Sequence, residues 1–150
     1  MNKRLWCVSA GLCAALIVLA SVQAGTSESQ VRDGLRAVAD EFQPESGWIL
    51  EQESVSGQLM CTGWDASCNT MFRTYRTNAL PTDAEVRGLA DKAGWQLQFD
   101  QACALPERQT GTEELCSGTG TANGYSVAVQ VSSAWTGGPT IITAQVTKLR

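Results

Sequence analysis

The chain has 150 residues, 43% of them hydrophobic and 17% charged, with a formal net charge of −4 and no histidine. This balance is typical of a single folded domain and not of a disordered segment. The negative charge and the lack of a basic cluster argue against nucleic-acid binding, which depends on Lys and Arg neutralising phosphates.

The first segment has the pattern of a secretory signal peptide. A positive start is followed by an uncharged apolar stretch to Ala20, and a small-x-small cleavage pattern ends at Ala24. We predict that residues 1–24 are removed and that residues 25–150 form one exported domain, in the periplasm, the cell envelope or the medium. An uncleaved anchor is the alternative, although the apolar run is short of the roughly 20 residues of a membrane span. Only an uncleaved signal peptide would bring the domain to a membrane.

Four cysteines remain in the mature domain, and an even count in an exported chain predicts disulfides. We favour two local bridges, Cys61–Cys68 and Cys103–Cys116, because both close loops rich in turn-forming residues. The other two connectivities stay open at this point. A zinc site is disfavoured because structural zinc sites pair ligands about two to four residues apart and histidine is absent. We therefore predict no metal and no cofactor.

The predicted elements begin with an amphipathic helix that starts near Ser27 and ends before Pro44. Its apolar stripe is formed by Val31, Leu35, Val38, Ala39 and Phe42. Two strands are predicted next, over residues 48–55 and 69–77, with the first cysteine pair between them. In the second strand, one face carries Met71, Arg73 and Tyr75 and the other carries Phe72, Thr74 and Arg76.

A second helix follows, with a capping box formed by Thr82 and Glu85 and a left-handed C-terminal cap at Gly94. Further strands are predicted over residues 95–101, 125–131 and 140–149, and residues 104–124 are predicted to be a long connection. Consecutive strands joined by short turns favour antiparallel pairing. The predicted fold class is therefore α+β, with an antiparallel sheet of about five strands, two helices packed on one face and two disulfides.

A local resemblance supports this architecture. The run that holds Cys68, the segment Phe72-Arg-Thr-Tyr-Arg76, Pro81, Gly94-Trp95 and Cys103 resembles small secreted or lipid-anchored bacterial envelope proteins of unknown function. In those proteins a strand with Tyr and Arg precedes a Pro-started helix that ends in Gly-Trp. The resemblance implies an envelope location and an α+β fold, and it brings no catalytic residue.

The sequence offers little catalytic chemistry. The lack of histidine excludes Ser-His-Asp and Cys-His mechanisms. Carboxylates could still support hydrolysis of envelope sugars if two of them met in a cleft. The residues considered for that role are Glu51, Glu53, Asp65 and Asp100, with Glu51 and Glu53 expected on one face of a strand. Alternating Glu residues usually mark the wet face of an antiparallel strand, so we predict no catalytic residue.

Aromatic residues are the remaining functional signal. Trp48 and Trp95 are predicted to be core, whereas Trp64 and Trp135 lie in predicted loops, where Trp often anchors a partner. Arg73 and Tyr75 could extend such a surface. We predict a non-enzymatic module that binds an unknown protein or cell-envelope component. The alternatives are a small carboxylate-dependent envelope hydrolase and a membrane-tethered accessory subunit that keeps its N-terminal helix.

Overall fold

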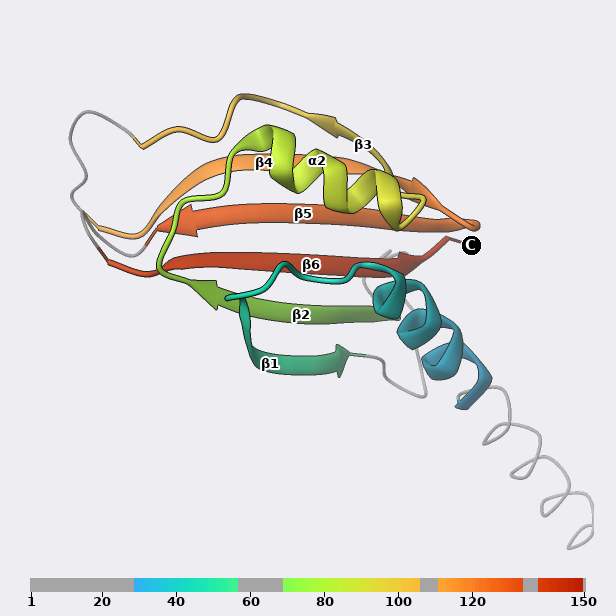
Figure 1. The fold of residues 1–150 in the computed structure, drawn as a ribbon. Coiled ribbons are helices and arrows are strands. Elements are labelled where there is room, and N and C mark those ends of the chain that lie inside the picture. Colours follow the sequence, from blue (N-terminus) through green and yellow to red (C-terminus); the bar gives the residue numbers. More distant parts are fainter. Residues whose placement is uncertain (1–28, 57–68, 106–110, 134–137, 150) are drawn as a thin grey trace, which may run out of the picture.

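The computed structural model describes residues 29–56, 69–105, 111–133 and 138–149, and in these the chain forms an α+β fold. A first helix (residues 29–41) precedes six strands and a second helix. These elements are β1 (Ile49–Ser56), β2 (Thr70–Thr77), α2 (Asp83–Lys92), β3 (Gln96–Phe99), β4 (Glu113–Ala122), β5 (Tyr125–Ser133) and β6 (Thr140–Lys148). All neighbouring strands are antiparallel, in the order β1-β2-β6-β5-β4-β3 (Figure 1).

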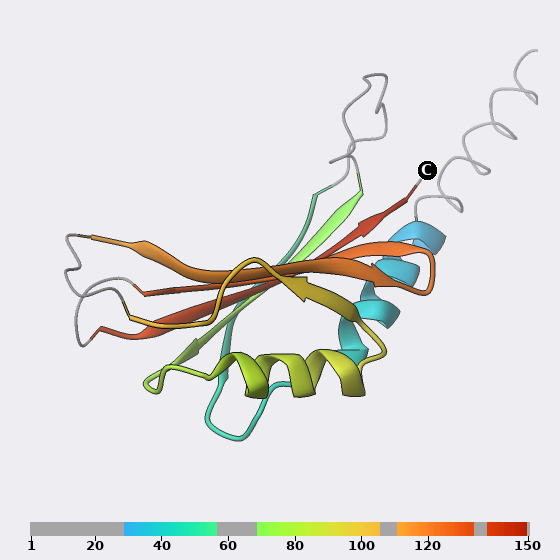
Figure 2. The ribbon, with the colours of Figure 1, turned by 90° about the horizontal axis from the view of Figure 1, so that it is seen from above.

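The two faces of the sheet differ in cover. Both helices lie on the same side of the sheet, and among the described residues no helix lies on the other side (Figure 2). On β5 and β6 every second side chain is apolar and buried on the helix side: Val127, Val129, Val131, Ile142, Ala144 and Val146. The side chains between them are mostly polar and only partly buried. The predicted division into an apolar and a wet face is therefore confirmed.

The helices form as the sequence predicts. Both hydrogen bonds of the capping box between Thr82 and Glu85 are present, and Gly94 has a φ of 69°. Trp95 follows and is fully buried. The ring of Phe42, at the end of the first helix, stacks on Trp95 with 5.0 Å between centroids and lies 6.4 Å from the ring of Tyr75 on β2. Helices and sheet therefore share one core.

The predicted connection over residues 104–124 is wrong, because β4 occupies Glu113–Ala122 and raises the strand number from about five to six. Small and polar residues resembled a loop, yet two glycines are needed for close packing against β3. A Cβ atom on Gly118 would lie 2.9 Å from the Phe99 ring, and one on Gly120 would lie 1.8 Å from the carbonyl oxygen of Gln96. Such close approach is a recognised use of glycine in strands.

One of the two predicted disulfides is present in the described part of the chain. Cys103 and Cys116 are bonded, with 4.8 Å between their Cα atoms. The bond joins the segment after β3 to β4. Cys61 and Cys68 lie outside the described residues, as does the predicted signal peptide. None of the helices in the described ranges is long and apolar enough to cross a membrane.

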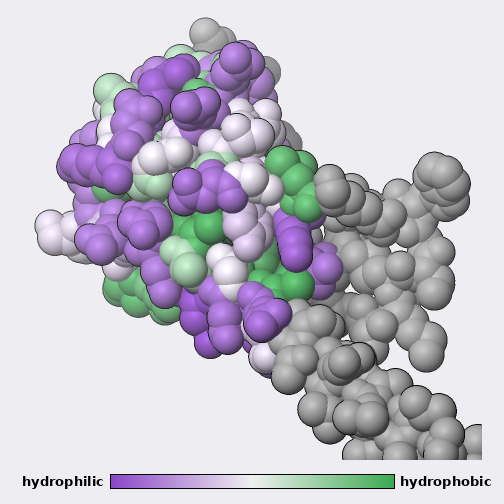
Figure 3. Space-filling model, turned by 90° about the vertical axis from the view of Figure 1, so that its right-hand side faces the viewer, coloured by the Kyte–Doolittle hydropathy of each residue, from purple (hydrophilic) through white to green (hydrophobic). Residues whose placement is uncertain are grey.

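The end of the molecule that carries the first helix is largely hydrophilic. In Figure 3, hydrophilic residues cover most of this end, and apolar residues show between them as small separate areas. Among the described residues, the exposed large apolar side chains are Ile49 and Leu50, which are adjacent in β1, and Leu105 and Leu149, which lie in two other segments. Scattered exposure of this kind is normal for a folded domain and does not define an apolar interface.

Candidate functional site

The uncovered side of the sheet, called here the open face, is made mostly of hydroxyl and amide side chains. The strand register places Thr74, Thr143 and Gln130 side by side across β2, β6 and β5. In full, the open face of β2 to β6 comprises Thr70, Phe72, Thr74, Arg76, Gln96, Gln98, Glu114, Ser117, Thr119, Thr121, Ser126, Ala128, Gln130, Ser132, Ile141, Thr143, Gln145 and Thr147. Arg76 and Glu114 are the charged residues in this set.

Many of these polar groups are engaged within the sheet. Arg76 forms an ion pair with Glu51 of β1 at 2.6 Å. Gln145 donates a hydrogen bond to the hydroxyl of Thr147 at 3.2 Å, and Gln130 donates to Glu114. These contacts engage Arg76, Gln130, Gln145 and Thr147, whereas Thr74 and Thr143 make no side-chain hydrogen bond within the described ranges.

A shallow groove of about 730 Å³ lies at the β3 end of the open face. Its lining residues are Asp91, Gln96, Leu97, Gln98, Thr119, Gly120, Thr121 and Ser126. Within the described ranges, the five Gln, Thr and Ser side chains of this lining make no hydrogen bond or ion pair. Their donors and acceptors therefore face solvent unpaired.

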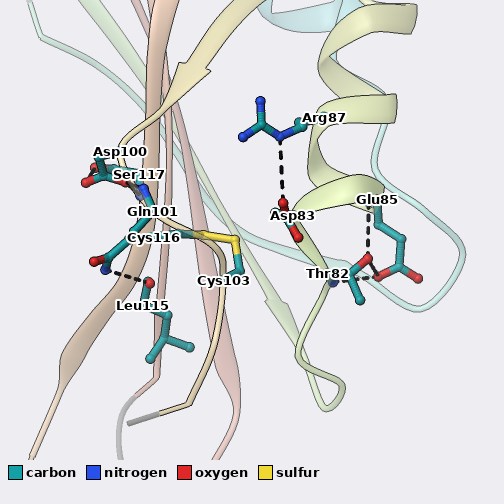
Figure 4. Close-up of a disulfide and its surroundings, with 10 residues drawn as sticks. All are labelled: Thr82, Asp83, Glu85, Arg87, Asp100, Gln101, Cys103, Leu115, Cys116 and Ser117. Carbon is teal, nitrogen blue, oxygen red and sulfur yellow. Dashed lines mark hydrogen bonds and ion pairs between the residues drawn. A yellow bond between two sulfur atoms is a disulfide. The ribbon is translucent and has the colours of Figure 1, made fainter.

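Beyond the end of β3, side chains of the next two residues continue the hydrogen bonding to β4 (Figure 4). The two carboxylate oxygens of Asp100 accept hydrogen bonds from the backbone N–H and the hydroxyl of Ser117, both at 2.9 Å. Gln101 donates from its amide to the carbonyl oxygen of Leu115 at 2.8 Å. The hydrogen bonds from Ser117 lower the pKa of Asp100. These contacts and the Cys103–Cys116 disulfide hold β3 against β4. They thereby also fix Gln96 and Gln98, the β3 residues whose polar side chains line the groove.

Arg73 and Tyr75, which the sequence suggested for binding, lie on the helix side of β2. The Arg73 side chain is 12% exposed, and its guanidinium donates hydrogen bonds to Glu53, to Asp40 and to the carbonyl oxygen of Ala39. Tyr75 is 3% exposed. Both residues hold the first helix against the sheet and are absent from the open face. Trp64 and Trp135 lie outside the described residues.

The expected placement of Glu51 and Glu53 on one face is wrong. The register between β1 and β2 shifts between Leu50 and Gln52, and this β-bulge reorients the strand. Glu51 pairs with Arg76 on the open face, whereas Glu53 pairs with Arg73 on the helix side.

The other carboxylates considered for hydrolysis do not complete a pair with these two. Asp100 follows β3 at the opposite edge of the sheet, and Asp65 is outside the described residues. A glycosidase needs two facing carboxyl groups, one with a raised pKa. The pKa values of Glu53 and Asp100 are both lowered. Glu51, Glu53 and Asp100 are therefore not arranged as this chemistry requires.

The Glu53 ion pairs predict an acid-sensitive contact between the first helix and the sheet. Partial burial raises the pKa of Glu53, but hydrogen bonds and charge from Arg73 and Arg36 outweigh burial, so the pKa lies below its usual 4.5. The folded state therefore favours the ionised carboxylate. This stabilisation is complete above about pH 4.5 and is lost as the pH falls through the lowered pKa.

We expect Glu53→Gln to remove part of this pH dependence. Melting temperatures between pH 6 and pH 3 should fall less steeply in the variant than in the native protein. Glu45→Gln, an exposed Glu for which no ion pair occurs among the described residues, is the matched control and should keep the native slope. Equal slopes in the native protein and Glu53→Gln would show that the ion pairs do not couple folding to pH.

Comparison with known proteins gives no guide to the function of this chain. No protein-family model, no curated protein and no solved structure matches the chain. The described residues also include no group of three or more His, Cys, Asp or Glu side chains that could hold a metal ion.

Proposed function

We propose that this protein is an exported, non-enzymatic binding module that binds a component of the cell envelope on its open face. The observation that carries this proposal is the groove at the β3 end, where uncharged polar side chains stand without partners in the described chain. Polar groups that a fold leaves unpaired on a rigid sheet can bind a ligand without giving up internal hydrogen bonds. The sheet supplies that rigidity because six paired strands fix the side-chain positions.

Two observations support export. The N-terminal sequence has the pattern of a signal peptide, and the Cys103–Cys116 disulfide suits an oxidising compartment. The non-enzymatic part of the proposal is supported by the histidine-free sequence and by the engagement of Glu51, Glu53 and Asp100 in contacts with neighbouring residues. No described feature favours a second function strongly enough to propose it.

The experiment is co-sedimentation of the purified mature protein with washed cell-envelope fragments of the producing organism. We expect saturable binding that Thr119→Glu weakens about tenfold or more, because it places a charge in the lining of the groove. Ala37→Glu is the matched control, since Ala37 is exposed on the first helix, away from the open face. Melting temperatures show that both variants fold.

Two results would overturn the proposed function. Native protein that stays in the supernatant at all concentrations does not bind the envelope. An equal loss of binding in Ala37→Glu and Thr119→Glu would mean that added negative charge acts without regard to the surface that carries it.

A further inference from the structure

We infer that the groove at the start of β3 binds a neutral oligosaccharide. This inference rests on the proposed function and deepens it by naming the site and the chemical class of ligand. The groove extends from Asp91, near the end of α2, to Ser126 on β5. Its volume of about 730 Å³ falls within the range of small-molecule sites, roughly 300–1,000 Å³.

The kind of side chain in the groove selects the chemistry of the ligand. Gln amides and Thr and Ser hydroxyls each donate and accept hydrogen bonds, as sugar hydroxyls do. Gln96, Gln98, Thr119, Thr121 and Ser126 bring five such groups together on neighbouring strands. A ligand with several hydroxyl groups can therefore pair with them in either direction and satisfy its own polar groups at the same time.

The charges in the groove exclude other ligand classes. The lining holds no Lys or Arg and one carboxylate, that of Asp91, so an anionic ligand meets repulsion and no counter-charge. A single carboxylate is a weak site for a cation. Leu97 is the one large apolar residue in the lining, so an apolar ligand would bury unpaired polar groups. A neutral polyhydroxylated ligand is not repelled by Asp91, needs no strong counter-charge and leaves no polar group of the groove buried without a partner.

The opposite edge of the same face provides the internal comparison. Gln52 of β1 and Thr74 of β2 form a register pair there, as Gln98 of β3 and Thr119 of β4 do in the groove. The two pairs have the same chemistry on the same face, but only Gln98 and Thr119 line the groove. If hydroxyl and amide groups alone were enough, both pairs would contribute equally to binding; if the groove matters, only Gln98 and Thr119 will.

The test is titration of the ¹⁵N-labelled mature protein with cellohexaose, maltohexaose and chitotetraose as neutral probes and hexagalacturonate as the anionic one. We expect at least one neutral probe to give saturable amide shifts at β3 and β4, and hexagalacturonate to give none. The double variant Gln98→Leu/Thr119→Val should weaken that binding about tenfold, because two hydrogen bonds are lost. The control Gln52→Leu/Thr74→Val should bind as the native protein does, and both spectra should remain those of a folded domain.

The outcomes separate this inference from the proposed function. No shift with any neutral probe, or equal weakening by both double variants, overturns the groove as an oligosaccharide site. If the protein still sediments with envelope fragments in that case, the proposed function stands and the ligand belongs to another class. If oligosaccharide binds in the groove but the protein does not sediment, the envelope assignment falls and the ligand class remains.

Discussion

We expect Gly120→Ala to lower the free energy of unfolding by about 3 kcal/mol, at the upper end of the usual cost of overpacking. The added Cβ would lie 1.8 Å from the backbone carbonyl oxygen of Gln96 and 3.1 Å from the Cα atom of Leu97. A backbone obstacle cannot rotate away as a side chain can, so β3 must separate from β4. Urea unfolding followed by tryptophan fluorescence measures the loss.

Gly88→Ala is the control for this substitution. Gly88 lies inside α2, and a Cβ atom there would meet nothing within 4 Å. Because Ala is the better helix former, we expect this variant to be more stable than the native protein by about 0.5–1 kcal/mol. The two substitutions should therefore change the free energy of unfolding in opposite directions. A Gly120→Ala variant as stable as the native protein would contradict the close approach of β3 to β4.

The second large effect is expected for Phe42→Ala, at about 3–5 kcal/mol. Phe42 is 1% exposed, and its ring stacks on Trp95 while lying near Tyr75. Truncation leaves a cavity where the first helix, β2 and the start of β3 meet. Since Phe42 is at the end of the first helix, the loss should also loosen that helix. Urea unfolding gives the stability, and hydrogen exchange of the backbone amides of residues 29–41 reports on the helix itself.

Glu41→Ala is the matched control because it precedes Phe42 on the exposed side of the same helix. Surface substitutions of this kind usually change stability by no more than about 0.5 kcal/mol. A cost below about 1 kcal/mol for Phe42→Ala would mean that the first helix does not share a core with the sheet, since a fully buried aromatic side chain cannot be truncated so cheaply.

Local patterns explain why much of the fold could be predicted. The apolar stripe of the first helix, the capping box at Thr82 and the alternation along β5 and β6 each depend on neighbouring residues in the chain. The short-range disulfide between Cys103 and Cys116 belongs to the same class of information. Each of these features has a physical cause within about a dozen residues, and each is present in the structure.

Features that depend on a partner strand were missed. The segment Glu113–Ala122 has the composition of a loop, and it forms a strand because Gly118 and Gly120 accept Phe99 and the β3 backbone at close range. The bulge in β1 likewise separates Glu51 from Glu53, although strict alternation would put them on one face. Neither effect can be inferred from the segment alone, since each arises from contact with a neighbour across the sheet.

The α+β class, both helices, the covered face of the sheet and one disulfide could be predicted from the sequence alone, because periodicity and capping are local. Which polar side chains are available to a ligand depends on the tertiary structure. Arg73 and Tyr75 stand in a strand with no mark of burial in their sequence, yet the first helix covers them. Gln98 and Thr119 are 21 positions apart, and the pairing of β3 with β4 places them opposite each other in the groove. Such a site exists only once distant strands have paired, because its side chains come from separate segments of the chain.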